Sequence, residues 1–268
     1  MTDNANVIAD LAADGDEVDR LVSGLEAAQW QTPTPAPGWT VAHQIAHLAA
    51  TFRMAGLAAS DPERFKAFAG GLGPDFDANV RAALGEFLDD PPDVLLRRWR
   101  EQRQAAQRAL GALPPGHLVP WLVRPLPAAV LAAAGMMELF GHGQDIADAL
   151  GVRRGYTDRI GHLVEFAART WDFGYLARGL AVPQVRLRLE LTAPSGREWT
   201  FGPAESPERV TGPAVDLCLL VTRRRHRDDL SLKATGAVAE HWLDIAQAYR
   251  GPAGEGRRPG QFPPIDGD

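Results

Sequence analysis

The sequence predicts a mainly α-helical protein that ends in a small α+β domain. Through most of the first 178 residues, apolar positions recur at intervals of three and four, which is the spacing of amphipathic helices. From Gln184 onward apolar and polar residues alternate, as is typical of a strand with one buried face. We therefore expect a helical domain over residues 1–178, a small α+β domain over 179–250 and a loose tail over 251–268.

The first domain contains five expected helices. The first ends before the Pro-rich stretch 32–38, and the second begins near Thr40, whose side chain suits an N-cap. A loop is expected between Ser60 and Pro74, where glycine and proline gather. The fourth helix is rich in arginine, which we interpret as a solvated face. The five helices are expected over residues 3–29, 40–52, 77–88, 92–113 and 128–150.

The second domain follows one more helix, which is expected over residues 160–176. The turn residues Pro194, Ser195 and Gly196 separate two strand-like segments and so predict a hairpin. Strands are expected over residues 184–191, 198–201, 208–211 and 230–235, and a closing helix over 237–249.

Composition and charge exclude several classes of protein. The 268 residues carry a net charge of −6, and an acidic chain without a broad basic face is not expected to bind nucleic acid. The N-terminal segment lacks the blocks of a secretory signal, and no apolar run reaches the roughly 18 residues of a membrane span, so we expect a cytoplasmic protein. The single cysteine, Cys218, lies in an apolar run and is interpreted as a core residue without a catalytic role.

Polar side chains on two of the helices suggest a metal site. Glu138, His142 and Asp145 fall within about 60° of one another on one helix, and a Glu and a His on adjacent turns can reach the same ion. His47, on another helix, is the expected third ligand, and two histidines with one carboxylate leave coordination positions open for catalysis. The alternative is a solvent-facing His47, because it lies about 120° from the apolar stripe of its helix.

Two motifs resemble those of a known metalloprotein superfamily. The segment Ala36–Leu48, APGWTVAHQIAHL, is similar to the Gly-Trp-Thr/Ser-Val…His-Leu signature of the DinB-like four-helix-bundle proteins. The segment Met137–Asp145, MELFGHGQD, resembles their Glu-x-x-x-His-x-x-Asp helix. Because a small α+β module follows the helices, the chain resembles the mycothiol-dependent maleylpyruvate isomerase branch. This resemblance implies a four-helix bundle followed by a sterol-carrier-like α+β module.

The resemblance also implies roles for individual residues. The metal ligands would be His47, Glu138 and His142, while His43 would have a supporting or structural role. Asp145 would support the site or contact the substrate, and Arg224 is the best match to an arginine of the C-terminal module that lies near the active site in this branch. The expected ion is Zn²⁺, with Ni²⁺, Mn²⁺ and Fe²⁺ as alternatives.

The resulting prediction is an enzyme that uses mycothiol, the thiol of this branch, at an open metal position. Coordination would present a thiolate to a small electrophile, which would be isomerised or would receive the sulfur. A metal-dependent hydrolase and a non-catalytic metal- or ligand-binding protein are the alternatives. The motifs of serine hydrolases, zincin proteases and P-loop NTPases are absent from the sequence. A monomer and a homodimer are both compatible with it.

Overall fold

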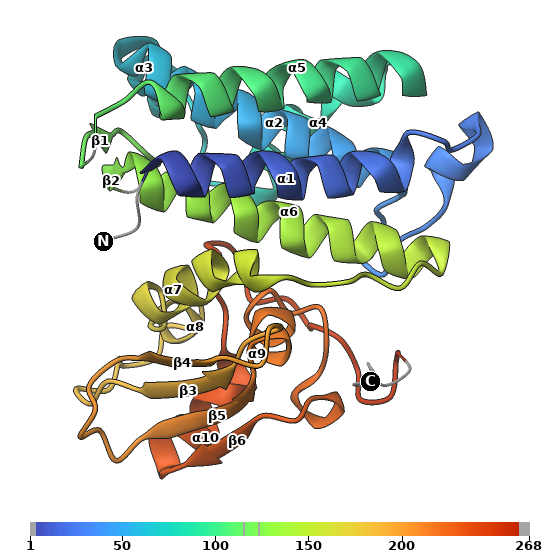
Figure 1. The fold of residues 1–268 in the computed structure, drawn as a ribbon. Coiled ribbons are helices and arrows are strands. Elements are labelled where there is room, and N and C mark those ends of the chain that lie inside the picture. Colours follow the sequence, from blue (N-terminus) through green and yellow to red (C-terminus); the bar gives the residue numbers. More distant parts are fainter. Residues whose placement is uncertain (1–3, 115, 123, 263–268) are drawn as a thin grey trace. The chain divides into compact units, whose positions relative to one another are not determined.

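The computed structural model describes residues 4–114, 116–122 and 124–262. The chain divides into two compact units, Met1–Arg154 and Gly155–Asp268. The division falls earlier than the expected boundary near residue 178, because helix α7 (Gly161–Arg169) packs against helix α9 (Ala214–Val221) of the second unit. The mainly helical architecture with a small α+β part is confirmed (Figure 1).

Four long helices form the bundle of the first unit. Helix α2 lies against α5 and α6, and α1 completes the ring by packing on α6 and α5 (Figure 1). The apolar stripe expected on α2 is fully buried, which places this helix at the centre of the core. The four helices are α1 (Asn4–Val22), α2 (Val41–Ser60), α5 (Pro92–Gly111) and α6 (Ala128–Leu150).

The prediction of a loop over the whole of residues 60–74 is wrong. Helix α3 (Pro62–Gly70) occupies most of this stretch. Pro62 stands in the first turn, where its fixed φ suits a helix, and the Asp61 side chain accepts a hydrogen bond from the backbone N–H of Arg64 at 3.1 Å. Phe65 then anchors the helix in the core. The glycines and prolines therefore mark the ends of a helix.

The remaining elements of the first unit are short, apart from α4. They are the 3₁₀ helix η1 (Ala27–Gln31), α4 (Phe76–Leu88) and the antiparallel pair β1 (Leu118–Val119) and β2 (Leu126–Pro127). The helix expected over residues 3–29 thus ends at Val22, before η1. None of the helices that the structure describes is long and apolar enough to cross a membrane.

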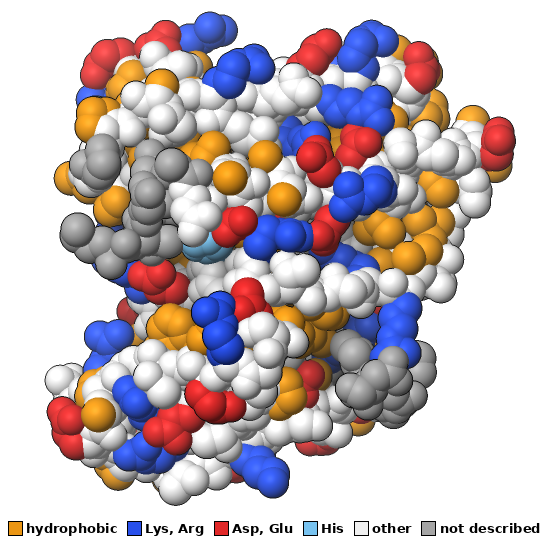
Figure 2. All heavy atoms as spheres, viewed as in Figure 1, with side chains coloured by type: hydrophobic (Ala, Val, Ile, Leu, Met, Phe, Trp, Pro, Cys, Tyr) orange, Lys and Arg blue, Asp and Glu red, His pale blue; other side chains and the backbone are white. Residues whose placement is uncertain are grey.

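The arginine-rich face of α5 is only partly solvated, contrary to expectation. Arg103 is 6% exposed and donates to Asp16 of α1 at 2.8 Å. Arg100 donates two hydrogen bonds, of 2.6 and 2.8 Å, to Asp19 one turn further along α1. The bidentate pair of Arg100 and the pair made by the buried Arg103 fix the register of α1 against α5. On the face shown in Figure 2, basic and acidic side chains are interspersed on each unit.

A four-stranded sheet forms the centre of the second unit. The strands are β3 (Arg188–Thr192), β4 (Glu198–Phe201), β5 (Arg209–Pro213) and β6 (Lys233–Thr235), in the order β4-β3-β5-β6. The expected hairpin is confirmed, since β3 and β4 pair antiparallel with Leu191 opposite Trp199. Strand β5 runs parallel to β3 and antiparallel to β6. Leu189 and Leu191 are buried, as their alternation predicts.

The helices of the second unit differ from the prediction in two places. The helix expected over 160–176 is broken at Thr170, whose hydroxyl donates to the carbonyl of Phe166 at 2.9 Å. Helix α9 was not predicted, because its sequence is apolar except for Asp216 and shows no helical period. Cys218 lies in α9 and is buried, as expected. The other helical segments are η2 (Asp158–Ile160), α8 (Phe173–Leu176), η3 (Arg227–Asp229) and α10 (Ala237–Ile245).

The described part of the C-terminal tail contacts the second unit. The backbone N–H of Gly260 donates to Asp229 at 2.8 Å, and the guanidinium of Arg225 lies 4.0 Å from the centre of the Phe262 ring. These contacts hold the tail as far as Phe262, where a loose terminus was expected. Residues 263–268 lie outside the described part of the chain.

Candidate metal centre

Three side chains from two helices of the bundle converge on one point. His47 projects from α2, and Glu138 and His142 project from successive turns of α6. Glu138 Oε2 lies 3.3 Å from Nε2 of His47 and 3.2 Å from Nε2 of His142. One donor atom from each residue lies within 4.8 Å of the other two. The structure thus brings together the three expected ligands, and His47 faces the bundle.

The cluster is charged and is largely shielded from solvent. The side chains of His47, Glu138 and His142 are 23, 21 and 12% exposed, which leaves room for access from one side. Burial opposes the ionisation of Glu138, but hydrogen bonds to His142 and His47 outweigh it and hold the pKa of Glu138 far below its usual value. The carboxylate is therefore ionised at neutral pH.

A hydrogen-bonded chain fixes the orientation of His142. The carbonyl of Trp39 can only accept, so the Thr34 hydroxyl donates to it, at 2.9 Å. Thr34 Oγ1 then accepts from the amide nitrogen of Gln44 at 2.8 Å, which leaves the Gln44 oxygen facing Nδ1 of His142 at 2.5 Å. Since that oxygen can only accept, Nδ1 of His142 carries a proton.

This protonation state tests whether the residues suit a metal. A neutral His142 with its proton on Nδ1 directs a lone pair from Nε2 toward a carboxylate oxygen 3.2 Å away. Two acceptors at this separation repel each other, so either a second proton on Nε2, which makes the ring an imidazolium that donates to Glu138, or a metal cation lies between them. Two ligands of one tetrahedral zinc ion lie about 3.3 Å apart, and two imidazoles with a carboxylate are a known catalytic donor set. The residues present therefore fit a divalent ion.

Trp39 forms an aromatic wall beside the cluster. Its ring centre lies 5.9 Å from that of His142, nearly parallel at 20°, and 5.4 Å from that of His47. The two imidazole centres are 4.4 Å apart. The indole thus restricts both rings and covers one side of the site with apolar surface.

The sequence did not identify Gln44 as part of the site. Gln44 is fully buried and lies one turn before Leu48, on the face that α2 directs into the core. A buried amide needs partners for its polar atoms, so a glutamine on an apolar stripe is itself a signal of a local network. Gln44 could have been singled out on this ground, since it lies in the same segment of sequence as His47.

His43 has a structural role, which was one of the two roles expected for it. Its Nδ1 accepts from the backbone N–H of Thr40 at 3.3 Å and lies 2.9 Å from the Thr40 hydroxyl. The ring therefore caps the N-terminus of α2 in the manner of a capping box. Burial lowers the pKa of His43, which favours the neutral ring that this acceptor role requires.

The other two predicted site residues belong to different units of the chain. Asp145 belongs to α6 and is fully buried one turn after His142. Arg224 belongs to the second unit, where it follows α9 and donates to the backbone carbonyl of Thr222 at 2.5 Å. The part of either residue in catalysis stays a prediction.

Comparisons of the sequence with known proteins relate the chain to one family. The family profile described as the mycothiol maleylpyruvate isomerase N-terminal domain matches residues 11–147, a span that includes all three donors. Two uncharacterised proteins, from two strains of Mycobacterium tuberculosis, are each 41% identical over 257 residues, which is 96% of this chain and 100% of theirs.

Solved structures show the same fold. A crystal structure of the mycothiol-dependent maleylpyruvate isomerase matches with a TM-score of 0.56, and a histidine-to-alanine mutant of that enzyme with 0.55. Both are 17% identical in sequence, and each match covers 81% of this chain and 88% of the other. With the profile match and the two close relatives, these findings lead to one conclusion: the chain belongs to the mycothiol maleylpyruvate isomerase N-terminal domain family.

Proposed function

We propose that the protein is a metal-dependent enzyme that uses mycothiol to isomerise a small electrophile or to transfer sulfur to it. The observation that carries this proposal is the convergence of one donor atom each from His47, Glu138 and His142, in which a divalent cation can take the place of a proton between Nε2 of His142 and Oε2 of Glu138. Membership of the family supports mycothiol as the thiol, and the similar solved enzyme is named as a mycothiol-dependent isomerase.

Each residue of the cluster has a defined task in this proposal. His47, Glu138 and His142 would hold the ion, for which Zn²⁺ is the first candidate and Ni²⁺, Mn²⁺ and Fe²⁺ are alternatives. When bound, such an ion would supply the means to lower the pKa of a thiol and so make it nucleophilic at neutral pH. Gln44 keeps the proton of His142 on Nδ1, and Trp39 excludes water from one side.

The chain has no accessible thiol of its own. Its single cysteine, Cys218, is fully buried in α9 and cannot act as the nucleophile. An external thiol is therefore part of the proposal. Asp145, buried on α6, would stabilise the helix segment that carries the ligands, and Arg224 would bind an anionic group of the electrophile. The proposed enzyme is cytoplasmic, acts without nucleic acid, and is a monomer or a homodimer.

Elemental analysis followed by thiol titration tests the proposal. The purified protein should contain one equivalent of a divalent metal, and a Co²⁺-substituted sample should develop a thiolate-to-metal absorption band when mycothiol is added. His142→Ala should show neither the metal nor the band. A metal without a thiolate band would favour the hydrolase alternative, and no metal after reconstitution would leave only a helical binding protein.

A further inference from the structure

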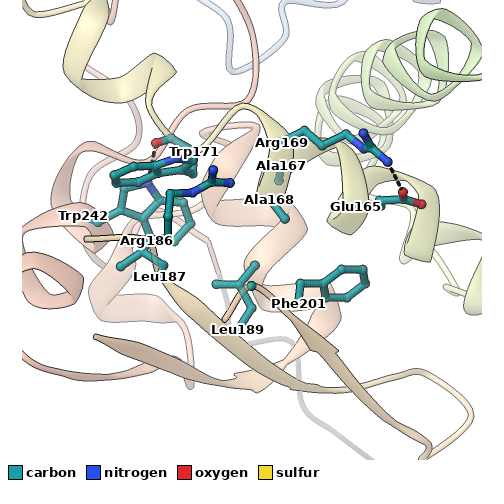
Figure 3. Close-up of a pocket in the computed structure, with 11 residues that line it drawn as sticks. Glu165, Ala167, Ala168, Arg169, Trp171, Arg186, Leu187, Leu189, Phe201 and Trp242 are labelled. Atoms are coloured by element: carbon teal, nitrogen blue, oxygen red, sulfur yellow. Dashed lines mark hydrogen bonds and ion pairs between the residues drawn. The ribbon is translucent and has the colours of Figure 1, made fainter. Parts of the chain in front are cut away.

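The second unit contains a pocket that shares no residue with the candidate metal centre. It has a volume of about 230 Å³ and lies between α7 and the hairpin strands β3 and β4 (Figure 3). Leu187, Leu189 and Phe201 line the side of the hairpin, and Trp171 and Trp242 close one end. At interior packing density, this volume holds a ligand of roughly ten non-hydrogen atoms.

Contacts at both ends of α7 hold the pocket open. At its start, a Cβ on Gly161 would lie 3.2 Å from the Trp199 ring, so helix and strand touch there. Beyond its end, the indole N–H of Trp242 donates to the backbone carbonyl of Trp171 at 2.8 Å. Since both contacts involve rigid aromatic groups, the space between them is preformed, as is usual for ligand sites.

Charge at the pocket distinguishes two arginines. Arg169 is paired with Glu165 at 2.7 Å, so its charge is compensated. Arg186 lies 5.7 Å from the centre of the Trp171 ring, and among the described residues no carboxylate is within ion-pair distance of it. Figure 3 shows its guanidinium beside the indole, directed over the apolar floor. An uncompensated guanidinium above an apolar, aromatic-walled space suits an amphipathic anion.

We propose that this pocket binds a small aromatic carboxylate. The ring of the ligand packs between Trp171 and the two leucines Leu187 and Leu189, and its carboxylate accepts hydrogen bonds from Arg186. An aromatic ligand is favoured over an aliphatic one because three of the lining side chains, Trp171, Phe201 and Trp242, are aromatic.

Binding of trans-cinnamate to the full-length protein tests this site. Ligand-observed NMR should give saturable binding with a dissociation constant at or below about 1 mM. In spectra of the protein itself, the indole N–H signal of Trp242 should shift when cinnamate is added. Cinnamamide, which has the same shape without the charge, should bind at least fivefold more weakly. Octanoate, of similar size and charge, should also bind more weakly.

Variants locate the site and check its charge. Arg186→Gln removes the cation from an exposed position and should weaken cinnamate binding at least fivefold, while Arg197→Gln, an arginine away from the pocket, should leave it unchanged. Ala168→Phe should fill the space and abolish binding. Unaltered affinity in Arg186→Gln would overturn the assignment of the anion site. Absence of saturable binding to the unmodified protein, or equal binding of octanoate, would overturn the proposed ligand class.

Discussion

The side-chain oxygen of Gln44 faces Nδ1 of His142 at 2.5 Å and so determines which nitrogen of that histidine is available to a metal. The amide end of Gln44 is held by Thr34, which is held in turn by the carbonyl of Trp39. Outer hydrogen bonds of this kind set the tautomer and the direction of a ligating imidazole. The geometry of the candidate metal centre therefore depends on a glutamine that is not one of its three donors.

Replacing Gln44 should weaken metal binding without unfolding the bundle. Gln44→Leu leaves Nδ1 of His142 without its acceptor, and we expect metal affinity to fall about 10- to 100-fold, measured by chelator competition. Gln44→Glu retains an accepting oxygen and should recover most of the affinity. The nitrogen chemical shifts of His142 in the metal-free protein provide an independent check, since loss of the Nδ1–H form is expected only in Gln44→Leu. An unchanged tautomer in that variant would refute the role of Gln44.

Each of the three donors should be required for metal binding. His47→Ala, Glu138→Gln and His142→Ala are expected to lose stoichiometric metal while keeping the helical circular dichroism of the parent, because each removes one ligand from the partly exposed cluster. His43→Ala is the matched control on the same helix. It removes a cap and should keep the metal. A donor variant with full metal occupancy would show that its residue is not a ligand.

Acidification should destabilise the protein through His43. Burial lowers the pKa of this ring from 6.5, so the unfolded chain takes up the proton at a higher pH than the folded one. The contribution of His43 to the free energy of unfolding is then largest above pH 6.5 and falls as the pH drops below it. Urea unfolding of the metal-free protein at several pH values should show this fall.

The matched variant for this pH dependence is His43→Gln. Glutamine at the third helical position can complete the capping box and does not titrate. The unfolding free energy of the parent protein relative to that of His43→Gln should therefore fall as the pH is lowered. A difference that is constant between pH 5 and pH 8 would mean that the titration of His43 has no part in the effect.

Two glycines in helices should respond to alanine in opposite ways. A Cβ on Gly143 of α6 would lie 2.9 Å from Cγ2 of Val18, a buried side chain of α1 that cannot move aside. Overpacking should outweigh the gain in helix propensity, and we expect Gly143→Ala to lose about 1 kcal/mol of unfolding free energy. A Cβ on Gly85 of α4 would meet no described atom within 4 Å, so Gly85→Ala should gain about 0.5–1 kcal/mol. Thermal unfolding of the two variants checks both signs.

The sequence was sufficient for features that depend on local periodicity. The stripe of α2, the β3–β4 hairpin and the spacing of Glu138 and His142 follow from the helical and strand repeats, which the structure reproduces. Helix α9 was missed because, with Asp216 as its only polar residue, it has no polar face to reveal its period. Helix α3 was missed because Pro62 looks like a loop residue when its place in a first turn is unknown.

The hydrogen-bonded network of the site required the structure. Thr34 precedes α2 in an irregular segment, and its approach to Gln44 depends on the path of the chain through residues 32–40. No periodicity specifies that path. Likewise, the pairing of Arg103 with Asp16 depends on how α1 packs against α5. The interpretation of the arginines as a solvated face did not anticipate this pairing.

The burial of Cys218 has a consequence if the protein handles an electrophile and a thiol, as proposed. A surface thiol in such a protein would be alkylated by its own electrophile or would form a mixed disulfide with its thiol cosubstrate. With its only sulfhydryl enclosed in α9, the folded protein is protected from both kinds of self-inactivation, and that protection lasts as long as the second unit stays folded.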